Sequence, residues 1–345
     1  MKIEKKFFQS QLELIKKCSS SSVNEDISDK IVFTDKGVFN NSRGRLITFL
    51  EGEYDFESMF MVDNLLNIVK AMPGEELDLK FGTDTEESVR LKISSDKTKL
   101  ALKPEEISNI QEQKDMIFAY VEDKKFFKLP SNFLEVIGKV LRCASSDKNH
   151  TFLCNINVQG KDLIASDNFK IGFFQMEKSF QGENFLIDTY NIQPIIDFDP
   201  KSYCLWEDRI IFKRGQNYQI CAINKDDYPD FKSIIERKSF FTIKFPDKIK
   251  EALYLAKQIP NKDVDRQISI VQEKFKILAS CKTQTGWLKQ TMVAAESGDN
   301  AFRMNLNVMD ELVNDLGLEI EINEEGTGKI VKEGFCFVFP VELGE

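Results

Sequence analysis

The sequence has little histidine, and its cysteines do not form the closely spaced pairs that bind transition metals. It contains one histidine, His150, and its seven cysteines are scattered along the chain without a CxxC pair. Structural zinc sites take four Cys or His ligands from closely spaced pairs, so the sequence predicts no zinc site. Most of the cysteines lie inside apolar runs, such as YCL around Cys204 and FCF around Cys336. We therefore expect buried, reduced thiols, as in cytosolic proteins.

Long apolar runs are missing as well. A membrane-spanning helix needs about 18 or more consecutive apolar residues, and the sequence has no such run. The N-terminal segment MKIEKKFFQSQLELIKK lacks the apolar core and the small-residue cleavage site of a signal peptide. Its pattern predicts a strand that leads into an amphipathic helix. The expectation is a cytoplasmic protein that makes no membrane contact.

The common catalytic and nucleotide-binding motifs do not occur. No GxSxG, HExxH or GxGxxG pattern is present. Residues 326–329 read GTGK, but Asn323 and Ile330 occupy the places where a phosphate-binding loop needs Gly and Ser or Thr, so a hairpin turn is predicted. Asp197 and Asp199 form a DxD pair that could hold Mg²⁺, although their place at a helix end before a proline favours a solvated turn. The sequence therefore predicts no enzyme, no metal and no cofactor.

The length of the chain limits the number of domains, and its net charge limits the kind of contact with DNA that can be expected. A chain of 345 residues is too long for one compact core, and two or three domains are expected. Its net charge of −9 argues against a protein that coats DNA with its whole surface. A positive stripe on one face remains compatible with that charge, so the distribution of the lysines matters more than the total.

The most informative feature is a threefold internal repeat. Each repeat reads as an amphipathic helix, several strands, a second helix and a strand meander. The first helices are predicted over 7–18, 131–144 and 246–259. The second helices are predicted over 61–72, 188–198 and 307–316. Strands are predicted directly after them over 77–81, 202–206 and 318–322, and further alternating segments with Gly or Asp turns predict antiparallel hairpins.

Two short charged linkers divide the repeats. EDKK at 122–125 and ERKS at 236–239 each precede a short strand and a proline, Pro130 or Pro246, that is well placed to open a helix. The sequence therefore predicts an α+β protein of three similar domains. The predicted domains are 1–122, 123–236 and 237–345.

Basic residues recur on the polar faces of the predicted helices. Lys139 and Arg142 lie opposite the apolar face of the helix over 131–144, and Lys250 and Lys257 do so in the helix over 246–259. Such lysines can simply keep surface helices soluble. Their repetition on equivalent helices also suits a diffuse positive surface that contacts phosphates without reading sequence. The sequence leaves both interpretations open.

Three short segments, in order, resemble the bacterial DNA sliding clamp, the DNA polymerase III beta subunit family. They read LIASDNFKI at 163–171, DYPDFKSII at 227–235 and FVFPVEL at 337–343, and they are similar to the clamp patterns LxATDGHRL, GxFPDYRxVI and VVMPVRL. FKLPS at 127–131 is similar to the entry of the clamp's middle domain. The resemblance spans the whole chain and is weakest over about 19–60.

The resemblance implies a processivity factor for DNA replication. Three clamp domains would place antiparallel sheets outside and two helices per domain along the wall of a ring that encircles double-stranded DNA. The ring would be a head-to-tail homodimer, with the strand edge near 96–103 meeting an edge near 265–275. The implied partners are a replicative DNA polymerase, a clamp loader and other proteins with clamp-binding peptides. The alternatives are a clamp-like adaptor that does not close around DNA and, less favoured, a nuclease or polymerase subunit with its own metal site.

The resemblance also assigns residues to two surfaces. The implied peptide-binding pocket comprises Leu153, Ser166, Asn168, Phe169, Lys170, Ile171, Pro229, Ser233, Ile234, Val338, Phe339, Pro340, Val341 and Leu343. The implied DNA-facing residues are Lys16, Lys17, Lys70, Lys139, Arg142, Lys148, Lys250 and Lys257. His150 is expected in a loop near this DNA face, and acids are expected on the outside and on the second helices.

Several positions depart from the clamp pattern. Phe169 and Phe339 are bulkier than the usual residues, Asn168 replaces a glycine, and Glu342 replaces a basic residue near the pocket. These changes predict an altered peptide preference. The same pocket residues could also be ordinary core between two domains.

Overall fold

The computed structural model describes residues 1–18, 29–42, 44–83, 88–106, 109–147, 149, 151–260 and 266–344. Lys148 and His150, for which DNA-facing positions were predicted, lie outside the described residues. The chain forms two compact units. Unit 1 comprises Met1–Gly138, Ile156–Lys161 and Met176–Asp226, and unit 2 comprises Lys139–Asn155, Asp162–Gln175 and Asp227–Glu345.

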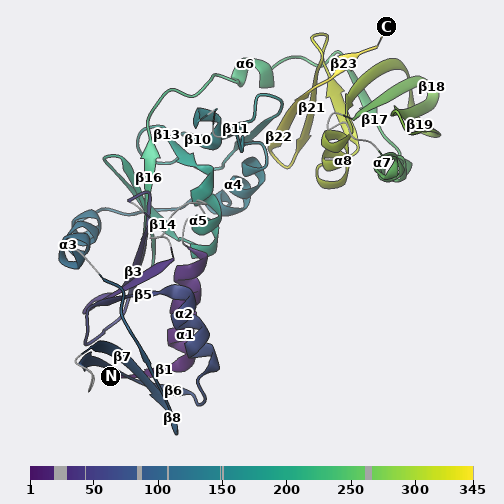
Figure 1. Cartoon of the computed structure of the whole chain (residues 1–345). Helices are drawn as coiled ribbons and strands as arrows, with labels where there is room; N and C mark the ends of the chain where they lie inside the picture. Colours follow the sequence, from purple (N-terminus) through teal and green to yellow (C-terminus); the bar gives the residue numbers. More distant parts are fainter. Residues whose placement is uncertain are drawn as a thin grey trace. The chain divides into compact units, whose positions relative to one another are not determined.

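The predicted order of helices and strands recurs three times (Figure 1). The first repeat contains β1 (Lys2–Glu4), α1 (Lys5–Lys17), β2 (Lys30–Thr34), β3 (Gly37–Ser42), β4 (Leu46–Glu51), β5 (Ser58–Met61), α2 (Val62–Ala71), β6 (Glu76–Thr83), β7 (Val89–Ser95) and β8 (Thr98–Leu102). The second contains β9 (Phe127–Lys128), α4 (Phe133–Leu141), η1 (Thr151–Cys154), β10 (Asn155–Gln159), β11 (Asp162–Ser166), β12 (Ile171–Gln175), β13 (Phe185–Asp188), η2 (Thr189–Asn191), α5 (Ile192–Phe198), β14 (Ser202–Trp206), β15 (Arg209–Arg214) and β16 (Asn217–Asn224).

The third repeat follows a short helix, α6 (Lys232–Ile235). Its elements are β17 (Phe241–Lys244), α7 (Lys248–Gln258), β18 (Gln267–Lys282), β19 (Trp287–Asn305), α8 (Leu306–Asp315), β20 (Glu319–Ile322), β21 (Thr327–Lys332), β22 (Phe335–Pro340) and β23 (Glu342–Leu343). Two long strands, β18 and β19, take the place that four shorter strands have in the other repeats. They pair over almost their whole length, with a register shift between Lys274 and Lys276.

Each predicted first helix and second helix is confirmed within a few residues of its expected bounds. Their apolar stripes are buried as the spacing predicts, for example Phe8, Leu12 and Ile15 in α1. The helices α4 and α7 begin two or three residues after Pro130 and Pro246, whose carbonyls accept from the Phe133 and Ile249 amides in a tight first turn. The α+β class with antiparallel sheets is confirmed.

Within each unit, strand ladders cross the predicted domain boundaries. In unit 1, β1-β6-β7-β8 form one sheet, and β10-β13-β16-β4-β3-β2-β5 are successive neighbours in another, from which β15, β14 and β9 branch. The β16–β4 ladder crosses the predicted 122–125 boundary, and in unit 2 the β12–β22 ladder crosses the one at 236–239. These ladders join residues on both sides of each predicted boundary, so the division into two units does not follow the repeats. The three-domain division stays a prediction.

The longest helix that was not predicted lies just before the first linker. α3 (Ile110–Val121) precedes the 122–125 linker and packs through Ile117 and Val121 on an apolar cluster that includes Phe49 of β4 and Ile220 of β16. Its signal was the spacing of Ile110, Ile117 and Val121 along one helical face.

Two further sequence predictions concern burial and membranes. All seven cysteines are free and buried, and burial raises the pKa of Cys143 and Cys221 to about 12, so both thiols stay protonated at neutral pH. Among the described residues, no helix combines the length and apolar character that crossing a membrane would require.

Candidate functional site

The segments that carry the resemblance meet on one face of a sheet in unit 2. There β11, β12 and β22 lie side by side, and their register places Ile171 opposite Val338 and Phe173 opposite Cys336. We call the resulting cluster the apolar patch. Its buried members are Ile164, Ile171, Ile235, Cys336 and Val338, and its half-buried members are Phe173, Tyr228, Phe231 and Ile234.

The segment 227–235 lies over the apolar patch and is held by two side chains. The Tyr228 hydroxyl accepts from the Ser166 amide at 3.2 Å and donates to the Asn155 carbonyl at 3.5 Å. Burial raises the pKa of Tyr228, so the hydroxyl keeps the proton that it donates. Lys232 binds the buried Asp162 carboxylate at 2.9 Å, and this hydrogen bond raises the pKa of the ammonium.

The turn between β11 and β12 is the second feature of this site. The Asp167 carboxylate accepts from the Phe169 and Lys170 amides, and the Ser166 hydroxyl accepts from the Asn168 amide. Asn168 has a φ of 75°, in the left-handed region that favours glycine and tolerates asparagine. Asn therefore keeps the turn geometry that a glycine would give. The turn presents Phe169 to solvent with 75% of its surface exposed.

The structure gathers only part of the implied pocket set. Ile171, Ile234 and Val338 belong to the apolar patch, and Ser166 contacts it through Tyr228. Phe339 alternates to the opposite face of β22, where its ring packs against Gly328. The other members are either buried, namely Leu153 and Val341, or at least partly exposed, namely Asn168, Phe169, Lys170, Pro229, Ser233, Pro340 and Leu343.

Six members of the apolar patch were not assigned from the sequence. They are Ile164, Phe173, Tyr228, Phe231, Ile235 and Cys336. Period-two alternation could have found two of them, because Phe173 must share a face with Ile171 and Cys336 with Val338. Tyr228 and Phe231 lie in the quoted 227–235 segment, but their side chains come from an irregular stretch whose direction no period predicts.

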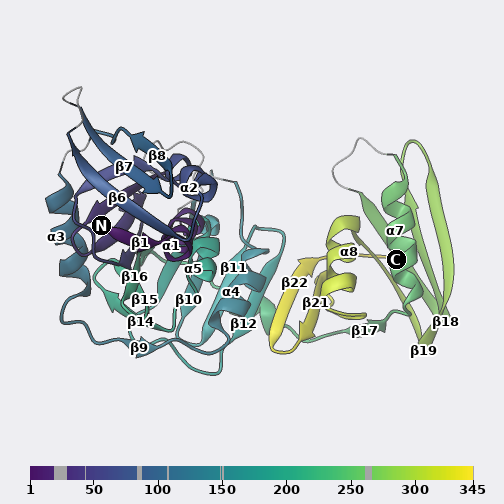
Figure 2. The same ribbon diagram turned by 90° about the horizontal axis from the view of Figure 1, so that it is seen from below.

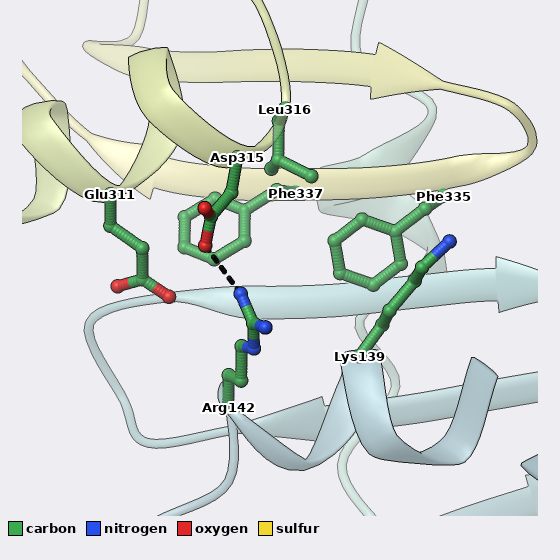
Figure 3. A pocket seen from close by; sticks show the side chains of 7 residues that line it. All are labelled: Lys139, Arg142, Glu311, Asp315, Leu316, Phe335 and Phe337. Carbon is green, nitrogen blue, oxygen red and sulfur yellow. Dashed lines mark hydrogen bonds and ion pairs between the residues drawn. The ribbon is translucent and has the colours of Figure 1, made fainter. Parts of the chain in front are cut away.

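The other face of β22 carries a small pocket of about 190 Å³ (Figure 3). Phe335 and Phe337 form its floor, and Leu316 closes one side. The Arg142 guanidinium, just after α4, binds the Asp315 carboxylate at the end of α8. A second ion pair joins Lys170 to Glu311 of α8 at 3.7 Å. Oppositely charged side chains thus join the end of α4 and the β11–β12 turn to α8.

Four of the seven predicted DNA-facing cations that the structure describes contact acids on neighbouring helices. Lys16 of α1 binds Asp63 of α2 at 2.5 Å. Lys70 of α2 binds Glu13 of α1 at 3.0 Å, which helps to lower the pKa of that carboxyl after the larger effect of the Gln9 amide.

The pair α7–α8 repeats the arrangement, since Lys257 binds Asp310 at 2.6 Å. Lys17 and Lys250 are exposed, and neither forms an ion pair with another residue in the described part of the chain. The helices α1 and α7 carry more lysines than acids, whereas α5 and α8 carry acids and no lysine. The repeated helices therefore differ in charge and are not uniformly positive.

The candidate metal and nucleotide motifs have structural roles. Gly328 pairs with Ile322 in the β20–β21 hairpin, which confirms the hairpin turn predicted around 326–329. Asp199 ends α5 in a left-handed conformation and binds Lys201 at 2.6 Å. Within the described ranges, no group of three or more His, Cys, Asp or Glu side chains is arranged to hold a metal ion.

Comparison with known proteins identifies the fold. No protein-family model matches the chain, and no curated protein matches its sequence. The structure is similar to the beta subunit from DNA polymerase of Streptococcus pyogenes (TM-score 0.79, 13% identity) over 99% of this chain and 98% of that one. It is similar to the Bacillus subtilis DNA polymerase sliding clamp (0.76, 16%) over 100% and 99%. It is also similar to the Pseudomonas aeruginosa beta subunit (0.79, 11%) over 99% of both chains.

Proposed function

We propose that this chain is the subunit of a DNA sliding clamp, a non-enzymatic ring that encircles duplex DNA and tethers a replicative polymerase to it. The observation that carries the proposal is the sliding-clamp fold over 99% of the chain, with the helix pair repeated three times. Two head-to-tail copies would supply six helix pairs, and such heterologous contacts close a ring when their rotation completes a circle. The three repeats would be the domains 1–122, 123–236 and 237–345.

The contact with DNA would be weak and independent of sequence. Lysines on flexible stems contact phosphates without reading bases, and salt weakens these contacts. In this chain the contact is weakened further, because acids such as Asp63 and Asp310 compete with phosphate for the same lysines. Weak contacts are enough for a sliding clamp, because a closed ring stays on DNA without strong attraction. Lys17 and Lys250, which have no ion-pair partner among the described residues, would supply the most accessible charges.

The edge strands β8 and β18 would join the two copies. β8 ends the sheet β1-β6-β7-β8, and β18 ends the sheet β18-β19-β23, so each leaves one side free of partners among the described strands. Free edges of this kind pair with strands of another chain. These are the edges expected to meet near 96–103 and 265–275.

The apolar patch would receive a short linear peptide from the polymerase, the clamp loader and other partners. An aromatic or leucine anchor can displace part of the half-buried covering side chains Phe231 and Ile234 and bury its own surface. A separate ATP-driven loader would open the ring in the cytoplasm.

Two measurements test the proposal together. Sedimentation of the purified chain should give a dimer. After an ATP-driven clamp loader has placed the dimer on nicked circular DNA, protein and DNA should co-elute at a salt concentration that abolishes simple phosphate binding. Cutting the circle with a restriction enzyme should release the protein, because a ring slides off free ends. A monomer with no preference for circular DNA would overturn the proposal and favour a clamp-like adaptor. Exposed Leu100→Lys and Phe275→Lys changes on the two edges should convert the dimer to monomers.

A further inference from the structure

Unit 1 contains a cleft of about 600 Å³ that the proposed clamp function does not use. The C-terminal end of α3 forms one wall, and the β2–β3 turn, the end of β4 and the β15–β16 turn form the others. Its volume lies within the range of ligand-binding clefts in proteins. The cleft depends on α3, the helix that packs through Ile117 and Val121 on the sheet beneath it.

The floor of the cleft is aromatic. Phe49 is buried, and its ring meets Phe118 edge-on with centroids 5.5 Å apart. Tyr218 lies beside Phe49 at 6.4 Å and is half-buried. Rings that are partly open to solvent and fixed by their neighbours can take up an apolar side chain without losing much conformational freedom.

The rim of the cleft is acidic. Four carboxylates, those of Asp35, Glu51, Glu53 and Glu122, stand against one ammonium, that of Lys36. Asp35 already binds Lys114 at 2.5 Å, and this contact lowers the pKa of the Asp35 carboxyl. The other three form no ion pair within the part of the chain that the structure describes.

The Lys36 ammonium, the one basic group among the described lining residues, does not neutralise that rim. Lys36 lies over the face of the Phe118 ring, 4.2 Å from its centroid, in a cation–π contact. An incoming cation is therefore directed to the three carboxylates of Glu51, Glu53 and Glu122. Nucleic acid and acidic peptides are repelled by the same rim.

We propose that this cleft is a second docking surface, and that it binds an extended segment of a partner protein in which an aromatic or leucine side chain is flanked by Arg or Lys. The apolar side chain packs on Phe49, Phe118 and Tyr218. The flanking cations pair with Glu51, Glu53 and Glu122.

The test uses the full-length chain and a fluorescein-labelled peptide with a central Leu-Phe pair flanked on each side by two arginines. Fluorescence anisotropy should show saturable binding, and Glu51→Lys with Glu122→Lys should weaken it by about tenfold or more, because two attractive rim charges become repulsive. The matched control is Glu112→Lys with Asp115→Lys, which makes the same charge change on exposed positions of α3 outside the cleft. The control should bind like the unchanged chain.

Two further probes separate docking from simple attraction of cations. A peptide with Ser-Gly in place of Leu-Phe keeps the arginines and should lose about tenfold in affinity if the aromatic floor contributes. Binding of the arginine-flanked peptide should persist in Ile234→Ser, which disables the apolar patch, and in that background the effect of the rim variants should remain. Equal weakening by the rim and control variants, or equal binding of both peptides, would overturn the proposal. Because the test involves neither DNA nor polymerase, its failure leaves the clamp proposal as it stands.

Discussion

The two faces of β22 are almost equally buried, but they are covered in different ways. Phe335, Phe337 and Phe339 point to one face, where Arg142, Asp315 and Leu316 at the ends of α4 and α8 lie over the first two rings (Figure 3). On the other face, Val338 is 2% exposed, but its cover is the irregular 227–235 segment with one short helix. A covering helix is stabilised by its own backbone hydrogen bonds. The 227–235 segment is instead held in place by the side chains of Tyr228 and Lys232. Burial alone therefore does not separate core from a binding surface.

The largest effect should come from the helix-covered face. Phe337→Ala removes a fully buried ring, and substitutions of this kind cost about 3–5 kcal/mol. We expect a loss of that size in the free energy of unfolding, measured by urea denaturation. The matched control is Phe169→Ala in the exposed β11–β12 turn, which should change stability by no more than about 0.5 kcal/mol. A cost for Phe337→Ala as small as that of the control would contradict the comparison.

Substitutions on the face of β22 that the 227–235 segment covers should lower peptide affinity more than they lower stability. Ile234→Ser changes a half-buried side chain of the cover, so we expect a modest loss of stability. Its affinity for a labelled peptide that ends in Leu-Phe should fall by about tenfold or more, as for an anchor-contacting residue. Anisotropy titrations with acidic, neutral and basic flanks would also test the altered preference expected from Phe169 and Glu342. Undiminished affinity of Ile234→Ser would remove the apolar patch as the peptide site.

The sequence predicted regular elements better than it predicted surfaces. Helix positions such as Phe8 and Leu12 follow a 3.6-residue period that burial imposes locally, so the six repeated helices were found. Val338 and Phe339 show the limit, because two adjacent residues on one strand must lie on opposite faces and a motif match does not say which face binds. The ion pairs of Lys16 and Lys257 could not be foreseen, since their partners come from another helix and depend on tertiary packing.

The fusion of four strands into β18 and β19 illustrates a further limit. In the second repeat, Gly160 with a φ of 60° turns the chain between β10 and β11. In the third repeat, Lys274 has a φ of 52° beside the β18–β19 register shift, and the strand continues instead of turning. A positive φ at a lysine is not marked in the sequence, because lysine is not a residue that typically adopts it. α7 runs along the resulting ribbon (Figure 2).

An intermediate loss of stability is expected when the Tyr228 hydroxyl, which holds the 227–235 segment in place, is removed. Tyr228→Phe keeps the ring but removes the hydroxyl that links the Ser166 amide to the Asn155 carbonyl. The lost hydrogen bonds should cost about 1 kcal/mol of stability. The substitution also removes a phenol whose pKa is raised in the folded chain. That phenol destabilises the fold as pH rises above about 10, where the unfolded chain ionises and the folded chain does not.

The pH dependence gives this prediction a second readout. Wild-type stability should fall more steeply than that of Tyr228→Phe as the pH increases from about 9.5 to 11, because only the wild type has this phenol to ionise on unfolding. Urea denaturation at several pH values measures both the stability lost with the hydrogen bonds and the dependence of stability on pH. Parallel pH profiles would show that the Tyr228 hydroxyl does not hold its proton in the folded state.

The smallest effect on stability should come from the ion pair above the helix-covered face. Arg142 and Asp315 are both about half-exposed, with 57% and 48% of their side chains accessible, and exposed pairs contribute about 0–1 kcal/mol. Asp315→Asn should therefore leave the urea midpoint nearly unchanged, while it frees Arg142 to contact phosphate. We expect tighter binding to short duplex DNA at low salt and a steeper decline with salt, because one more cation per subunit releases counterions. Asp208→Asn is the matched control, since Asp208 also binds an arginine, Arg209, but on the β14–β15 turn and not on one of the six repeated helices. If both variants raise DNA affinity equally, the gain reflects net charge, and the proposed role of the helical acids in competing with DNA is wrong.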